Sequence, residues 1–116
     1  MIIISKYHSS KTRVDGITFD SKAEATRYCE LKIMQKAGYI SGLTLQPEFE
    51  LIPTYKKNGK TVRKTVYKAD FRYYDQFTGK TVIEDVKGVK TPVYKLKKKL
   101  FEYLFPEYEI KEITTK

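Results

Sequence analysis

The stretch Tyr67–Gly88 reads YKADFRYYDQFTGKTVIEDVKG, and its pattern predicts two neighbouring β-strands joined by a turn. Each predicted strand carries one acid that a purely structural strand would not need, Asp70 in the first and Asp85 in the second. Two acids and a nearby lysine can hold a divalent cation and a phosphate oxygen together. The stretch therefore predicts a metal site, which the other segments would complete.

The faces of the second strand, predicted over 81–87, distinguish its two adjacent acids. Strand side chains alternate between faces, so Asp85 shares a face with Lys87 and Glu84 points the other way. Asp85 and Lys87 fit a metal ligand with an ammonium group beside it. They also fit a weak ion pair on an exposed surface, and both interpretations stay open.

The first strand is predicted to be long, running from 61 to 75. One of its faces places Asp70 between Lys68 and Arg72. An acid that balances two bases on a solvated face would give this pattern. Two phosphate-binding cations around a metal ligand would give it as well.

A helix is predicted from 21 to about 37, because Ser21 and Glu24 fit a capping box and Gly38 would end the helix. Its buried face should carry Tyr28, Leu31 and Met34, and Glu24 falls in the same stripe. Glu24 is therefore either a capping residue or a third acid of the metal site.

A second helix should begin after Thr91 and Pro92 and run to about 105. Lys95 lies on a basic ridge, and Lys97 falls inside the apolar arc. Lys97 would either extend out of the interface or meet a phosphate. The predicted apolar face consists of Val93, Leu96, Leu100, Tyr103 and Leu104.

The remaining segments are shorter. We expect a lead-in at 1–13 with a possible strand at 2–4, a loop at 38–47, a strand at 49–52 and a final strand at 108–113. Asn58-Gly59 predicts a hairpin tip with three lysines, which is either a solvated turn or a loop that contacts DNA.

Composition limits the classes of partner and cofactor. The 116 residues suit one domain, and a formal net charge of +9 favours nucleic acid first and an acidic membrane second. With one cysteine and one histidine, a Cys/His zinc cluster cannot be built, so oxygen ligands and Mg²⁺ or Mn²⁺ are expected. The apolar run Met1–Ile4 is too short for a signal peptide or a membrane span, which predicts an intracellular protein.

The order of these features resembles the PD-(D/E)xK nuclease superfamily, which includes restriction endonucleases and Holliday-junction resolvases. Glu24 matches the first-helix acid, Asp70 the first motif acid, and Asp85 with Lys87 the second motif. One departure is Ala69, which stands where the superfamily's name has proline. The chain is most similar to a small phage- and prophage-encoded family, through the segments VDGITFDSKAEATRYCELK, LQPEFEL, YKADFRYYD and VIEDVKGVKTPVYKLKKKLFEYLFPEYE.

The resemblance covers nearly all of the chain from Val14 onward and implies a single α/β nuclease domain. The implied core is restriction-endonuclease-like, with a mixed sheet of about four strands flanked by two main helices. Mg²⁺-dependent DNA cleavage is implied, with Glu24, Asp70 and Asp85 as ligands and Lys87 as a catalytic group. Lys68, Arg72, Lys95 and Lys97 are expected to contact phosphates.

The expected substrate is branched DNA, such as a Holliday junction in phage recombination or packaging, and a domain this small is expected to act as a homodimer. The alternatives are a non-catalytic DNA-binding module and a phage assembly protein.

Overall fold

The computed structural model describes residues 11–114, so the predicted strand at 2–4 and most of the lead-in lie outside the described residues. No helix within 11–114 is long and apolar enough to span a membrane. In chain order the elements are β1 (Thr12–Val14), β2 (Ile17–Phe19), α1 (Lys22–Lys36), β3 (Ile40–Leu45), β4 (Glu48–Ile52), β5 (Tyr55–Lys57), β6 (Lys60–Val62), β7 (Thr65–Lys68), β8 (Phe71–Asp75), β9 (Lys80–Lys87), α2 (Pro92–Leu104) and β10 (Ile110–Thr114).

The main sheet has four strands in the order β10-β9-β8-β3. β10 runs parallel to β9, and the other neighbours are antiparallel, so the sheet is mixed. The parallel pair is connected through α2, as a parallel pair requires a crossover. A mixed sheet of four strands with two helices confirms the α/β class predicted from the sequence.

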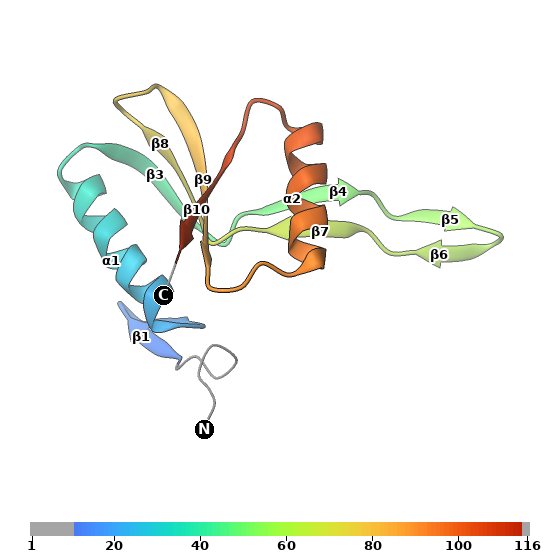
Figure 1. Cartoon of the computed structure of the whole chain (residues 1–116), viewed down its shortest axis with the longest axis horizontal. Coiled ribbons are helices and arrows are strands. Elements are labelled where there is room, and N and C mark those ends of the chain that lie inside the picture. The colour runs from blue at the N-terminus through green and yellow to red at the C-terminus, as the bar shows by residue number, and fades with distance from the viewer. Residues whose placement is uncertain (1–10, 115–116) are drawn as a thin grey trace.

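Two apolar clusters lie on opposite faces of this sheet, one with each helix (Figure 1). Alternate residues of β9 enter different clusters: Ile83 packs with α2, whereas Val82 and Val86 pack with α1. The α1 cluster contains Tyr28 and Leu31, so the predicted buried face of this helix is confirmed. The sheet therefore offers two separate environments to acids that are adjacent in sequence.

The segment 61–75 is not one long strand, and that prediction was wrong. The chain bends at Ala69–Asp70, where β7 ends and β8 begins. Before the bend, Ala69 N–H donates to the Pro47 carbonyl; after it, Asp70 N–H donates to the Glu84 carbonyl on β9. The chain exchanges one pairing partner for another at this point, and the bend turns the β4–β7 ribbon away from the main sheet (Figure 1).

The predicted loop at 38–47 was also wrong, because most of it forms strand β3 at the edge of the main sheet. Gly42 has a φ of 66°, and the register of β3 against β8 shifts between Ser41 and Thr44. A glycine bulge of this kind interrupts the alternation of side chains without ending the strand. Ile40 nevertheless anchors β3 in the α1 cluster.

The orientation of α2 differs from the prediction. Leu96 and Tyr103 are 64% and 81% exposed, whereas Tyr94 and Phe101 are buried. Val93 and Leu104 are exposed as well. The helix is apolar over much of its circumference, and aromatic packing decides which part faces inward: the Phe101 ring lies 4.8 Å from Phe49, centroid to centroid.

Truncation of two α2 residues should separate the observed face from the predicted one. Phe101→Ala removes a fully buried ring and should lower the free energy of unfolding by about 3–5 kcal/mol. Leu96→Ala, which removes an exposed side chain, should change it by less than about 0.5 kcal/mol. Urea denaturation of both variants measures the difference, and equal losses would contradict the observed orientation.

Candidate functional site

The bend at Ala69–Asp70 attaches Asp70 to β9 on both sides of Asp85. Asp70 N–H donates to the carbonyl of Glu84 at 3.0 Å. The Asp70 carboxylate accepts a hydrogen bond from Val86 N–H at 2.7 Å through Oδ2. These two contacts flank Asp85 in sequence, so the break in the predicted strand is what brings the two acids together.

Asp85 is 3% exposed and is held by two groups of the chain. The Tyr67 hydroxyl donates a hydrogen bond to Oδ2, and the Lys87 ammonium group lies 3.2 Å from Oδ1. Lys87 Nζ also lies 4.0 Å from the centroid of the Tyr94 ring, which favours the cation. Asp85 and Lys87 therefore form an ion pair that is mostly buried, which excludes the interpretation as a weak pair on an exposed surface.

Burial raises the pKa of the Asp70 carboxyl to about 8. The hydrogen bond from Val86 N–H lowers this pKa, and the negative charges of Glu24 and Asp85 raise it. Burial, followed by the charges of Asp20 and Asp85, raises the pKa of Glu24 as well. The three predicted acids thus lie within electrostatic range of one another, in surroundings that disfavour their combined negative charge.

Glu24 is not part of a reciprocal capping box. Ser21 Oγ accepts a hydrogen bond from Glu24 N–H at 3.1 Å, so the cap uses only the backbone of Glu24. Within residues 11–114 the Glu24 carboxylate has no hydrogen bond or ion pair. Its side chain is not used by the cap, and the other interpretation, a third acid of the metal site, stays a prediction.

The donor set suits a hard cation, since carboxylate oxygens are the ligands that Mg²⁺ and Mn²⁺ prefer. Asp70 and Asp85 form the adjacent pair, and Glu24 acts on them through its charge. Among residues 11–114 no three acid, histidine or cysteine side chains form a complete metal cage. The residues present fit a cation held by two aspartates, with the remaining ligands from outside the side chains described.

The four predicted phosphate contacts are spread over β7, β8 and α2. Lys68 on β7 is exposed and lies 4.0 Å from Glu48. Arg72 on β8 is half-buried and pairs with Ile83 on the face that carries Asp85. Lys95 is exposed on α2, and Lys97 is half-buried there. No contact between these four and the acids occurs in the described part of the chain, and their role with phosphate stays a prediction.

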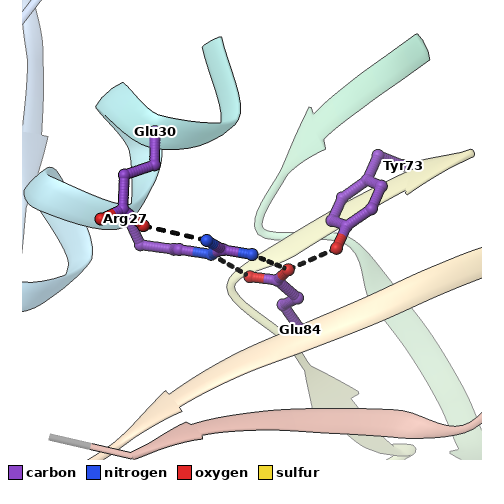
Figure 2. Close-up of polar contacts among 4 residues, drawn as sticks. All are labelled: Arg27, Glu30, Tyr73 and Glu84. Atoms are coloured by element: carbon purple, nitrogen blue, oxygen red, sulfur yellow. Dashed lines mark hydrogen bonds and ion pairs between the residues drawn. The ribbon is translucent and has the colours of Figure 1, made fainter. Parts of the chain in front are cut away.

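A buried ion pair that the sequence reading missed joins α1 to β9 (Figure 2). Glu84 is fully buried and accepts hydrogen bonds from Arg27 Nε at 2.8 Å and Nη2 at 2.7 Å. The Tyr73 hydroxyl donates to the same carboxylate, and Arg27 Nη1 reaches Glu30 at 2.9 Å. The signal in the sequence was an acid on the apolar face of a strand, which requires a buried partner.

A second missed acid, Glu112 on β10, fixes the start of α2. It accepts a hydrogen bond from the Tyr94 hydroxyl at 2.8 Å, and the Lys90 ammonium group lies 2.9 Å away. Lys90, Tyr94 and Lys98 lower the pKa of Glu112 to about 2, against the effect of burial. Because the ring of Tyr94 also contacts Lys87, the hydrogen bond between Tyr94 and Glu112 helps to position Lys87 beside Asp85.

Comparison with known families bears on this site. A family model described as a protein of unknown function (DUF1064) matches residues 4–116. The chain belongs to the DUF1064 family. Comparison with curated proteins and with solved structures gave no match. Membership of the DUF1064 family does not specify an activity, so the geometry of the acids and their neighbours is the basis for a functional proposal.

Removing the cation of the buried pair should be costly. Arg27→Met leaves Glu84 buried without a positive partner and should lower the free energy of unfolding at pH 7 by about 3–5 kcal/mol, measured in urea. Lys32→Met, at an exposed position of the same helix, is the matched control and should have little effect. The double variant Arg27→Met with Glu84→Leu should recover most of the loss. A single variant within about 1 kcal/mol of the wild type would contradict this assignment.

Asp70 should make the metal-free protein less stable as the pH rises. In the folded state the pKa of Asp70 is about 8, so it keeps its proton below that pH, whereas in the unfolded chain its pKa returns to the usual value of 3.8. The folded state therefore binds more protons between these values, and its stability falls with rising pH.

Asp70→Asn removes this dependence. Measured in EDTA, its stability relative to the wild type should increase toward pH 8 by up to about 1.4 kcal/mol per pH unit. Glu109→Gln, at an exposed acid, should follow the wild type. Parallel curves for the wild type and Asp70→Asn would show that Asp70 is ionised across the range.

Proposed function

We propose that this DUF1064 protein is a metal-dependent DNA endonuclease with a restriction-endonuclease-like core of the PD-(D/E)xK type. The observation that carries the proposal is the attachment of Asp70 to β9 on both sides of Asp85, with Lys87 paired to Asp85. A fold stabilised only by packing gains nothing from placing the half-buried carboxyl of Asp70 next to the buried carboxyl of Asp85, because repulsion between their charged forms opposes it.

The electrostatics of the site support a resident cation. Protons or a cation can neutralise the site, and near neutral pH a divalent ion would favour the ionised form of Asp70. Mg²⁺ or Mn²⁺ bound there would supply an activated water and neutralise charge on a phosphate. A DNA binder without a metal would gain nothing from these acids, because those that are ionised repel phosphate.

The chain's own residues have distinct roles in this proposal. Asp70 and Asp85 hold the cation, and the hydroxyl of Tyr67 fixes the orientation of the Asp85 carboxylate. Burial and the charge of Asp85 raise the pKa of Tyr67, so its hydroxyl keeps the proton that it donates. Lys87, held between Asp85 and the Tyr94 ring, orients the attacking water or stabilises charge on the phosphate.

Branched DNA in phage recombination or packaging is the substrate we propose, cut by a homodimer within the cell. A two-fold symmetric pair of sites suits a two-fold symmetric junction. The net charge of +9 supports a polyanionic substrate. A non-catalytic DNA-binding module and a phage assembly protein are the rivals, and neither has a use for the neighbouring acids Asp70, Asp85 and Glu24.

Cleavage of supercoiled plasmid and of a synthetic four-way junction tests the proposal. The wild type should cut with Mg²⁺ or Mn²⁺ and not with EDTA. Asp70→Asn and Asp85→Asn should each reduce the rate by about 100-fold or more, because each removes charge from the metal site. Glu109→Gln should cut like the wild type, and urea midpoints should show that all variants are folded.

Two outcomes would contradict the proposal at different points. A wild type that binds DNA but cuts neither substrate with either metal would leave the binding module as the function. An Asp85→Asn variant that cuts as fast as the wild type would show that the catalytic site lies elsewhere.

A further inference from the structure

A basic arm, defined as residues 53–64, extends from the body of the protein. It contains β5, β6 and the turn between them, and it continues the β4–β7 ribbon away from both helices (Figure 1). Asn58 and Gly59 have φ values of 53° and 75°, as expected for a tight hairpin turn. Almost every residue of the arm is exposed, and none belongs to either apolar cluster.

The charges of the arm have one sign. From 52 to 68 the sequence contains no acid, and it contains six bases: Lys56, Lys57, Lys60, Arg63, Lys64 and Lys68. Of these six, only Lys68 has an ion pair within residues 11–114. Lys57 lies directly opposite Lys60 in the hairpin, where like charges destabilise the pairing.

Folding alone does not explain this arrangement. A two-stranded hairpin without a core is marginally stable in water, and the repulsion between Lys57 and Lys60 lowers its stability further. The arm does not support either helix or the main sheet. A polyanion bound along it would supply the missing negative charges.

We propose that the basic arm lies in a groove of duplex DNA and contacts backbone phosphates remote from the site of cleavage. A two-stranded ribbon fits the major groove of B-DNA, which is about 12 Å wide. Lys56 lies on one face of the ribbon, and Lys57 and Lys60 lie on the other, so the arm can reach phosphates on both sides of a groove. Lysines act as point charges on phosphate, so the contact does not read sequence.

The reach of the arm gives the proposal a length scale. Twelve positions separate Asn58 at the tip from Asp70, which corresponds to at most about 40 Å of extended chain. The longest dimension of the molecule, 52 Å, accommodates this span. At 3.4 Å per base pair, the tip of the arm would touch DNA up to about twelve base pairs from the acids. This step rests on the proposed function, because it places the scissile phosphate at Asp70 and Asp85.

An anionic membrane is the rival partner, and the arm suits it less well. Membrane-binding segments place a continuous apolar face into the interface. Tyr55 is the only aromatic residue of the arm, and it shares a face with Lys57 and Lys60 instead of lying opposite the charges.

The test compares two triple variants that lose the same charge. Lys56→Gln/Lys57→Gln/Lys60→Gln changes the arm, and Lys32→Gln/Lys36→Gln/Lys111→Gln changes exposed lysines elsewhere. Binding to duplexes of 8 and 24 base pairs is measured in EDTA by fluorescence anisotropy across a salt series. The short duplex cannot span the acids and the arm tip together, and the long duplex can.

The wild type and the control triple should bind the 24-base-pair duplex at least tenfold more tightly than the 8-base-pair duplex, after correction for the number of binding positions that each duplex offers. The arm triple should lose this gain. Its slope of log K against log salt on the long duplex should fall by about 2.7, which is 0.9 for each lost phosphate contact. Urea midpoints should match those of the wild type.

Several results would overturn the inference. The arm triple could bind both duplexes like the wild type, or it could lose no more affinity than the control triple does. A sedimentation coefficient of the arm triple that differs from that of the wild type would make the arm a contact between subunits. Arm-dependent binding to phosphatidylserine vesicles with no effect on DNA would assign the arm to a membrane. A wild type that binds through the arm yet cuts nothing would sustain the arm and reject the nuclease.

Discussion

The buried pair of Arg27 and Glu84 is the constraint on which the site depends. It ties the first turns of α1 to β9 at the residue next to Asp85. Glu24 lies one turn before Arg27, so the same contact sets how far the Glu24 carboxylate lies from the acids of the sheet. Replacing such a pair with apolar residues can leave stability unchanged or increase it, so its advantage here is geometric.

Glu84 and Asp85 are adjacent on β9 but lie in different surroundings, because a different helix packs on each face of the sheet. Glu84 enters the α1 face, where a guanidinium and a tyrosine hydroxyl satisfy both of its oxygens. Asp85 enters the α2 face beside Asp70, and within residues 11–114 its side-chain partners are Lys87 and Tyr67. One guanidinium faces the single carboxylate of Glu84, whereas one ammonium group faces Asp85 with the carboxyl of Asp70 beside it. This contrast is the physical basis for placing chemistry at Asp85 and structure at Glu84.

Local periodicity was enough to predict much of this arrangement. The two-residue alternation of a strand separated Asp85 from Glu84, and the Ser21 cap and the Asn58-Gly59 turn have short-range signals that the structure confirms. What the sequence could not provide depends on long-range pairing. Arg27 and Glu84 are 57 positions apart. The bend at Asp70 depends on the partners that Pro47 and Glu84 offer from other strands.

The error on α2 has the same origin, since several faces of this helix are apolar enough to be buried. The face that contacts the sheet is selected by its neighbours, above all by the ring of Phe49 against Phe101. Within the site, the sequence predicted Asp70 as a metal ligand but not its raised pKa. That pKa depends on burial and on the carboxylates of Glu24 and Asp85, which lie on two other elements.

Charge is distributed unevenly over the molecule, with acids at the proposed site and bases on the arm. This separation supports a substrate that contacts both the acid site and the arm. Asp70 lies at the bend next to Asp85, and Glu24 lies within electrostatic range of both, whereas the arm from 53 to 64 carries only bases. A polyanion attracted by the arm would be repelled at the acids unless a cation lies between them and a phosphate. The arm can attract a polyanion with or without metal, whereas the acid site would attract a phosphate only once a divalent ion is held at Asp70 and Asp85.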